Sequence, residues 1–274
     1  MLRPSRRLAS FSQDLWYEAL KSLAAPIVRD QLVNTEVIGL ENIPAAGPAL
    51  LVPNHRTMTD PFLLAAYVPR RIHYVVAGFL SRFPLSSRVI EGTGNIILPV
   101  SSGGRSQELI RKARRMLLRG RLVGVFPEGV DNFVNGSPSG TVSAFHSSFA
   151  RLIVGLKVPD LPVVPIAITG DEEQALVRFP SQLMRAIDPG NKAWIEGEVR
   201  GTIYRKARIH VGSPLAFDNF YDLPDEQREA GIRQITRVVR EAVVDLAEAP
   251  SPKRAATSRK TPALTGPLFD PTDI

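Results

Sequence analysis

His55 and Asp60 are the side chains whose types and spacing most directly indicate chemistry, and four residues separate them. A carboxylate that bonds an imidazole fixes the ring's tautomer and stabilises the imidazolium that forms on proton uptake. They follow an apolar run at 49–52, and Pro61 is typical of the first turn of a helix. We therefore expect a general base on a strand-to-helix loop, with Asp60 at or near the N-cap. Taken alone, the pair is a weak signal and is better explained as a core histidine held by an aspartate.

A second block, at the end of the apolar run 122–126, favours the catalytic interpretation. It consists of Phe126, Pro127, Glu128 and Gly129, and later blocks read Val-Val-Pro-Ile-Ala-Ile at 163–168 and Ile-His-Val-Gly-Ser-Pro-Leu at 209–215. Together with Asn54-His55 and Asp60, these blocks in this order resemble the glycerolipid acyltransferase family, which includes the lysophosphatidate (1-acyl-glycerol-3-phosphate) acyltransferases. The resemblance covers roughly residues 35–215.

The resemblance implies transfer of a fatty acyl group from a coenzyme A or acyl-carrier-protein thioester to the hydroxyl of a lysophospholipid or related lipid. His55 would take the hydroxyl proton and Asp60 would orient it, with no metal and no cofactor beyond the thioester co-substrate. Backbone N–H groups of residues 54–56 are candidate donors to the oxyanion. The implied substrate-binding residues are Asn54, Phe126, Pro127, Glu128, Gly129 and Arg105.

Glu128 and Gly129 also have a simpler interpretation. The block can be a strand-end turn in which the Glu128 carboxylate bonds backbone N–H groups. Gly129 would then serve a tight turn or a close approach of the backbone to a ligand. The sequence leaves both interpretations open, and we favour acceptor binding for Glu128.

The chain departs from the family's pattern at two places that bear on the acceptor phosphate. Val130-Asp131-Asn132 stands where lysophosphatidate acyltransferases usually carry Thr-Arg or a similar pair, and residues 94–100 lack the arginine of their second block. Arg105, Arg56 and Arg71 are candidates to replace it. The acceptor is therefore a lysophospholipid or another lipid alcohol, and a noncatalytic lipid-binding relative of the family is the alternative function.

Composition narrows the classes of function. The 274 residues include no cysteine, which excludes thiolate nucleophiles, disulfides and cysteine-based metal sites. The 34 Lys and Arg residues exceed the 27 Asp and Glu residues, giving a net charge of +7. Such a surface favours anionic partners: a lipid headgroup, coenzyme A phosphates or an acyl-carrier protein. Nucleic acid is disfavoured, because no binding motif occurs and aromatic residues are sparse in the basic stretch 105–121.

Apolar runs alternate with helical patterns along most of the chain, which predicts a mostly parallel α/β sheet flanked by helices, as the family resemblance also implies. Strands are expected at 35–40, 49–52, 72–76, 95–98, 122–126, 163–169, 192–199 and 207–211. Helices are expected at 61–68, 105–119 and 145–156, with a last amphipathic helix between 232 and 246. Sites in such sheets gather where the strands end, so His55 and Glu128 should share one cleft.

The two ends of the chain differ in composition from the middle. Residues 11–31 follow an amphipathic pattern that suits packing on the domain or lying in a bilayer interface, and no run is long enough to span a membrane. Residues 250–274 read as a disordered basic tail. We thus divide the chain into a helical segment at 1–32, an acyltransferase domain at 33–249 and the tail. The expected location is cytoplasmic, peripheral on the inner face of the cell membrane.

Overall fold

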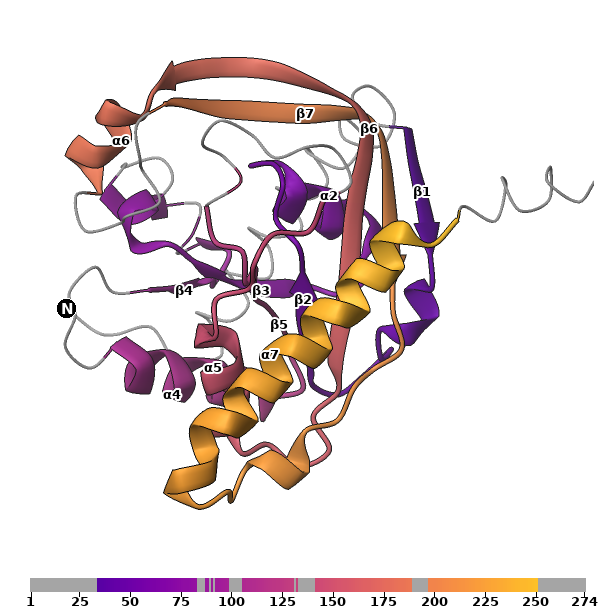
Figure 1. The fold of residues 1–274 in the computed structure, drawn as a ribbon, viewed down its shortest axis with the longest axis vertical. Helices are drawn as coiled ribbons and strands as arrows, with labels where there is room; N and C mark the ends of the chain where they lie inside the picture. The colour runs from indigo at the N-terminus through magenta and orange to yellow at the C-terminus, as the bar shows by residue number, and fades with distance from the viewer. Residues whose placement is uncertain are drawn as a thin grey trace, which may run out of the picture.

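A seven-stranded sheet forms the centre of the molecule, in the order β1-β7-β6-β2-β5-β3-β4 (Figure 1). The computed structural model describes residues 34–82, 87–88, 90, 92–98, 105–130, 132, 141–188 and 197–250. Strands β6 and β7 pair antiparallel, whereas the other neighbours pair parallel. The prediction of a mostly parallel α/β sheet is therefore confirmed.

The elements lie close to where the apolar patterns predicted them. The strands are β1 (Asn34–Ile38), β2 (Ala49–Pro53), β3 (Ile72–Val76), β4 (Ile96–Ile97), β5 (Leu122–Gly124), β6 (Val163–Pro180) and β7 (Glu198–Val211). The α-helices are α2 (Asp60–Tyr67), α4 (Arg105–Leu117), α5 (Ser148–Leu156), α6 (Ser181–Ile187) and α7 (Asp225–Glu248), with 3-10 turns at Leu40–Asn42, Gly78–Arg82 and Asp218–Phe220. The helix predicted at 11–31 and the tail predicted beyond residue 250 lie outside the described residues.

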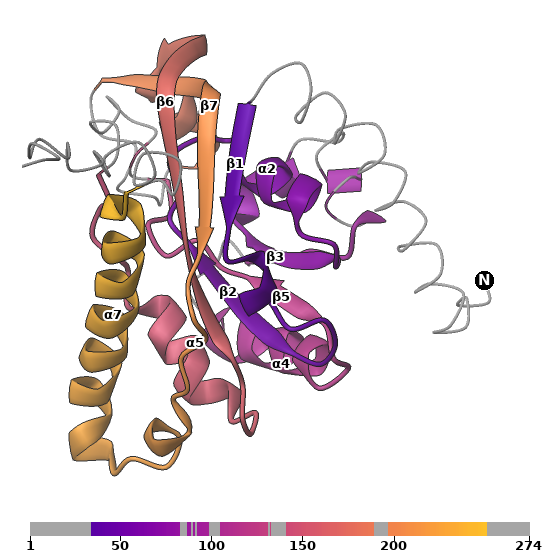
Figure 2. The same cartoon turned by 90° about the vertical axis from the view of Figure 1, so that its right-hand side faces the viewer.

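Helices cover both faces of the sheet because the buried strands are apolar on both sides. On β2, Leu50 and Val52 pack with residues of α4, α5 and α7, whereas Ala49 and Leu51 pack with residues of α2. Figure 2 shows α5 and α7 on one side of β6 and β7, with α2 on the other. None of the described helices is long and apolar enough to cross a bilayer.

The long antiparallel pair β6–β7 differs from the prediction. We predicted two strands, at 192–199 and 207–211. Residues 192–196 lie outside the described residues, and a single strand, β7, runs from Glu198 to Val211 and pairs with β6 over most of its length. The predicted break at 200–206 is wrong because Arg205 and Lys206 interrupt the apolar pattern. Both are exposed, and since successive side chains of a strand point to opposite faces, solvent reaches both faces of the ribbon here.

The parallel strands β2 and β5 bring the two predicted blocks to one edge of the sheet. Ala49 of β2 is in register with Leu122 of β5, and Leu51 with Gly124. Since both strands run in the same direction, the loops after Pro53 and after Gly124 leave the sheet side by side. The fold thereby places His55 and Glu128 in one region, as the sequence predicted.

Candidate active site

Asn54 fixes the loop that carries His55. Its Nδ2 donates to the carbonyl oxygen of Ile168 at 2.9 Å, and its Oδ1 accepts from the Ile168 N–H at 2.6 Å. The amide thus extends the pairing of β2 with β6 by one side chain after the strand has ended. Asn54 is 1% exposed, so these contacts give it a positioning role, while substrate contact by Asn54 stays a prediction.

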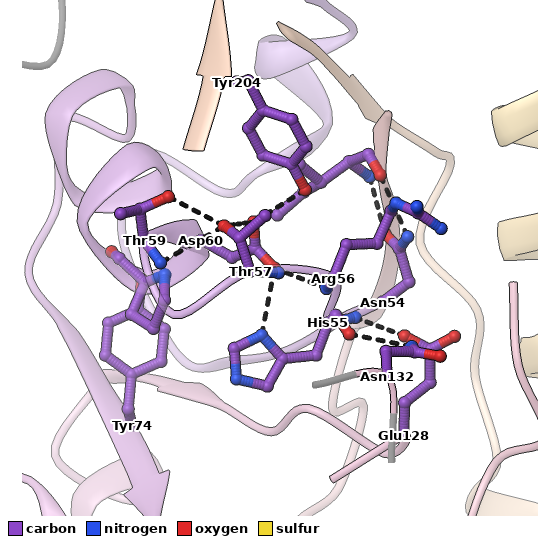
Figure 3. A network of polar contacts seen from close by, with 12 residues as sticks. Asn54, His55, Arg56, Thr57, Thr59, Asp60, Tyr74, Glu128, Asn132 and Tyr204 are labelled. Atoms are coloured by element: carbon purple, nitrogen blue, oxygen red, sulfur yellow. Dashed lines mark hydrogen bonds and ion pairs between the residues drawn. The ribbon is translucent and has the colours of Figure 1, made fainter. Parts of the chain in front are cut away.

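Asp60 is fully buried, and its carboxylate is the point where the loop, the helix start and β7 converge (Figure 3). Oδ2 accepts the N–H of Arg56 at 2.7 Å and of Thr57 at 2.9 Å, and it lies 3.0 Å from His55 Nδ1. Oδ1 accepts the hydroxyls of Thr57 and Tyr204, both at 3.0 Å. These hydrogen bonds hold the carboxylate in one orientation.

The His55 ring takes its tautomer from this carboxylate. Oδ2 of Asp60 accepts, so Nδ1 of His55 carries the proton and Nε2 is left as the basic nitrogen. The ring stacks on Phe126 with centroids 4.1 Å apart, and Phe126 stacks in turn on Tyr74. The side chain of His55 is 13% exposed while that of Asp60 is not exposed at all. The imidazole therefore reaches the surface and its carboxylate does not.

Glu128 joins the His55 loop to the loop that follows residue 141. One carboxylate oxygen accepts the N–H of His55 and the other accepts the N–H of Ser143 at 2.5 Å. Asn132 donates its Nδ2 to the His55 carbonyl oxygen at 2.9 Å and accepts from the Ser143 hydroxyl. These contacts match the turn interpretation of Glu128. Its predicted contact with the acceptor stays a prediction.

Burial raises the pKa of the Glu128 carboxyl above its ordinary value. The hydrogen bonds from His55, Ser143 and Asn132 act in the opposite direction, because they stabilise the ionised form, but they do not cancel the effect of burial. Glu128 is 0% exposed, so solvent does not relieve this cost.

The other predicted residues of the Phe-Pro-Glu-Gly block also lie at this edge. Pro127 is buried, and its carbonyl oxygen accepts the His146 N–H at 2.9 Å. Gly129 has a φ of +64° and closes a turn by donating its N–H to the Phe126 carbonyl oxygen at 3.2 Å. A positive φ favours glycine, so this turn explains the residue without a ligand.

The arginines proposed to replace the family's phosphate ligand are engaged within the protein. Arg56 is 5% exposed and donates to the Thr141 carbonyl oxygen at 2.9 Å. Arg71 donates to the Thr93 carbonyl oxygen. Arg105 is the first residue of α4, and its side chain lies outside the described part of the structure, as does Asp131. A phosphate role for Arg56 or Arg71 would have to use other N–H groups of the guanidinium than those in these contacts.

The backbone donors that the sequence suggested for the oxyanion are already used. The Asn54 N–H donates to the Ile166 carbonyl oxygen, the His55 N–H to Glu128 and the Arg56 N–H to Asp60. This corrects the expectation from the sequence, because an N–H group that is bonded inside the protein has no hydrogen to offer a substrate.

Sequence reasoning missed four residues of this network: Thr57, Asn132, Ser143 and Tyr204. Asn132 had a signal, because it follows the Phe-Pro-Glu-Gly block by only three positions. Tyr204 had none, because 144 residues separate it from Asp60 and only the pairing of β7 with β6 brings it close. Its ring lies against Gly170, where a Cβ atom would come within 1.9 Å of Tyr204 Cδ1. Gly170 therefore provides the space that the ring needs.

Tyr204→Phe tests whether the hydroxyl holds Asp60. We expect the free energy of unfolding to fall by about 1.5–3 kcal/mol, because a buried carboxylate loses a donor. We also expect the ring resonances of His55 in NMR spectra to move, since the carboxylate that bonds its Nδ1 loses another hydrogen-bond donor. Tyr67→Phe, on α2, is the matched control. Unchanged His55 resonances in Tyr204→Phe would contradict the positioning role.

The raised pKa of Glu128 predicts a pH-dependent contribution to stability. The folded chain binds the Glu128 proton more tightly than the unfolded chain, so the contribution is full below the ordinary value of 4.5 and declines as pH rises toward the raised pKa. The unfolding free energy of the wild type minus that of Glu128→Gln should therefore decrease with rising pH above 4.5. Denaturant titrations at several pH values measure it, with the exposed Glu226→Gln as control. An increase with pH would contradict the prediction.

Comparisons with known proteins identify the family and the fold. Residues 34–169, about half of the chain, match the family described as acyltransferase. Among solved structures, the 1-acyl-sn-glycerophosphate (LPA) acyltransferase PlsC from Thermotoga maritima shares the fold, with a TM-score of 0.52 and 20% identity. The match covers 92% of this chain and 86% of that one, and the search of curated proteins finds no match. The chain therefore belongs to the glycerolipid acyltransferase family.

Proposed function

We propose that this acyltransferase moves a fatty acyl group from a coenzyme A or acyl-carrier-protein thioester to the hydroxyl of a lysophospholipid or related lipid, with His55 as general base. The observation that carries the proposal is the buried Asp60 carboxylate, which holds Nδ1 of His55 at 3.0 Å while the ring reaches the surface. Glu128 and Asn132, on the loop after β5, fix the backbone of His55 as well, so the ring needs little reorganisation to act.

The proposed reaction needs one proton carrier. Nε2 of His55 takes the acceptor's hydroxyl proton as the hydroxyl oxygen attacks the thioester carbonyl carbon. The tetrahedral intermediate then collapses, the carbon–sulfur bond breaks, and the imidazolium returns the proton to the leaving thiolate. Asp60 stabilises the imidazolium between these two steps. General-base help of this kind contributes about 10²–10⁴-fold to the rate.

His55→Ala is the direct test of this proposal. We expect kcat/KM for acyl transfer to fall by about 10²–10⁴-fold, because the general base is lost. His210→Ala is the matched control, since His210 lies on β7 and bonds the Leu246 carbonyl oxygen. The assay incubates purified protein with labelled acyl-coenzyme A and a panel of lysolipids, and identifies the product by mass spectrometry. Circular dichroism and thermal unfolding verify that each variant is folded.

Two outcomes of this assay would contradict the proposal in different ways. Full activity of His55→Ala would remove His55 as the base while leaving the family assignment intact. A wild-type protein that binds liposomes but releases no coenzyme A with any lysolipid, and transfers no acyl group from an acyl-carrier protein, would favour the noncatalytic lipid-binding relative.

The same proposal includes a peripheral position on the inner face of the cell membrane, where lipid acceptors lie. Two large apolar side chains support it: Met58 is 41% exposed, and Phe62 is 54% exposed. Both belong to the loop and first helical turn that also hold His55 and Asp60. Apolar side chains that enter the acyl boundary of a bilayer gain burial, and here they would bring the imidazole to the lipid surface.

Met58→Ser combined with Phe62→Ser tests this orientation. We expect binding to lipid vesicles to weaken about tenfold, because exposed apolar area no longer enters the bilayer. Leu118→Ser combined with Leu183→Ser is the matched control, since those side chains are 57% and 54% exposed and lie after α4 and on α6. Vesicle sedimentation measures the binding. Equal losses in both double variants would contradict the proposed orientation.

A further inference from the structure

A basic groove lies between α7 and the loop before α5, apart from the site described above. Its volume is about 540 Å³. Six of its lining residues carry polar side chains: His146, Ser147, Arg233, Thr236, Arg237 and Arg240. No acidic residue is among the described residues that line it. The groove thus combines three guanidinium groups with two hydroxyl groups and an imidazole.

The helix periodicity explains why the arginines face the same way. Arg233, Arg237 and Arg240 stand at i, i+4 and i+7, which places them on one side of α7. Arg233 and Arg237 are exposed, whereas Arg240 is partly buried and donates to the carbonyl oxygens of Ser143 and Val142, both at 2.9 Å. Arg240 therefore fixes the opposite wall, and the other two guanidinium groups can meet a ligand.

Two nearby carboxylates, Glu229 and Glu241, offset part of the charge of this face. Glu229 of α7 pairs with Arg151 of α5 through two hydrogen bonds of 2.5 and 2.8 Å. Glu241 lies 3.9 Å from Arg237 Nε, which is too long for a hydrogen bond. A planar guanidinium bonds phosphate oxygens through paired N–H groups, and a hydroxyl donor such as Ser147 suits the same oxygens.

We propose that this groove binds the phosphate of an organic anion. The inference rests on the proposed function for its choice of ligand, since acyl-coenzyme A and the phospholipids of the bilayer are the phosphate-bearing molecules that reaction would meet. The two sources share the same recognition chemistry, so the experiment has one arm for each.

The position of the groove argues against the acceptor's own phosphate. Phe145, on the groove wall, packs into the core on the side of α5 and α7, whereas Phe126, beneath the His55 ring, packs on the side of α2. In lysophosphatidate the phosphate is only a few bonds from the reacting hydroxyl, so it must stay near the imidazole. A phosphate bound here belongs to a molecule with a long arm, as in coenzyme A, or to a separate lipid.

The groove and the candidate base nevertheless share one loop. The Ser143 carbonyl oxygen accepts from Arg240 on the groove side, and the Ser143 N–H donates to Glu128, which also binds the His55 N–H. A ligand that orders the groove wall would therefore also order the support of His55.

The experiment removes the two exposed arginines and measures binding without turnover. Arg233→Ala combined with Arg237→Ala is compared with Arg185→Ala combined with Arg228→Ala, exposed arginines on α6 and at the start of α7. Calorimetry with adenosine 3′,5′-bisphosphate, and with adenosine as the phosphate-free reference, tests the nucleotide arm. Sedimentation with phosphatidylglycerol vesicles, and with phosphatidylcholine vesicles as reference, tests the lipid arm.

We expect the groove variant to bind one of the two phosphate probes about tenfold more weakly, while the control pair keeps wild-type affinity. Weaker binding of the bisphosphate assigns the groove to the nucleotide of the thioester donor. Weaker binding of phosphatidylglycerol vesicles alone assigns it to a lipid headgroup. Equal affinities of the groove and control variants for both probes, or binding of adenosine as tight as that of its bisphosphate, would overturn the inference.

Failure of this inference is distinguishable from failure of the proposed function. Binding of either probe needs no reacting hydroxyl, so His55→Ala should retain it even where acyl transfer is lost. Conversely, the wild-type enzyme can transfer acyl groups while the groove and control variants bind both probes equally well. In that case the groove inference fails and the proposed reaction stands.

Discussion

The arrangement of the site depends on one buried carboxylate. Removing Asp60 from water costs several kcal/mol. Its two oxygens are surrounded by two backbone N–H groups, two hydroxyl groups and one imidazole, all within 3.0 Å. Hydrogen bonds that a carboxylate accepts are stronger than those between neutral groups, so these five contacts offset much of that cost. The carboxylate is thus fixed in place, and its position gives the neighbouring His55 ring one orientation.

A second buried carboxylate positions the same residue from the other side. Glu128 holds the His55 N–H and Asn132 holds the His55 carbonyl oxygen, so both backbone polar groups of that residue are bound by side chains from the loop after β5. The Phe-Pro-Glu-Gly block therefore supports the backbone of His55 through Glu128, while Phe126 supports its ring. Effects of substitutions in this block on catalysis can arise without any contact with the substrate.

How much of the fold and of the site the sequence predicts depends on how far apart the interacting residues lie along the chain. The parallel sheet, the helix starting at Asp60 and the meeting of His55 with Glu128 follow from apolar periodicity, from Pro61 and from the rule that strand ends share an edge. The hydrogen bond of Tyr204 to Asp60 does not follow, because it depends on the register of β6 and β7, two long strands that form an antiparallel ribbon. The role of Glu128 does not follow either, since the Phe-Pro-Glu-Gly block has the same residues at the same spacing whether Glu128 binds substrate or backbone.

The loop at 141–147 connects the remaining features. It contributes the Ser143 N–H to Glu128, the Thr141 carbonyl oxygen to Arg56 and the His146 N–H to the Pro127 carbonyl oxygen. Arg240 of α7 binds the same loop from the opposite side. Helix α7 thereby fixes the loop at 141–147, and that loop in turn supports the loop that carries His55. Because most of these bonds use backbone atoms, they constrain the shape of the loop more than its sequence, and a family motif restricted to residues 54–60 and 126–129 does not contain them.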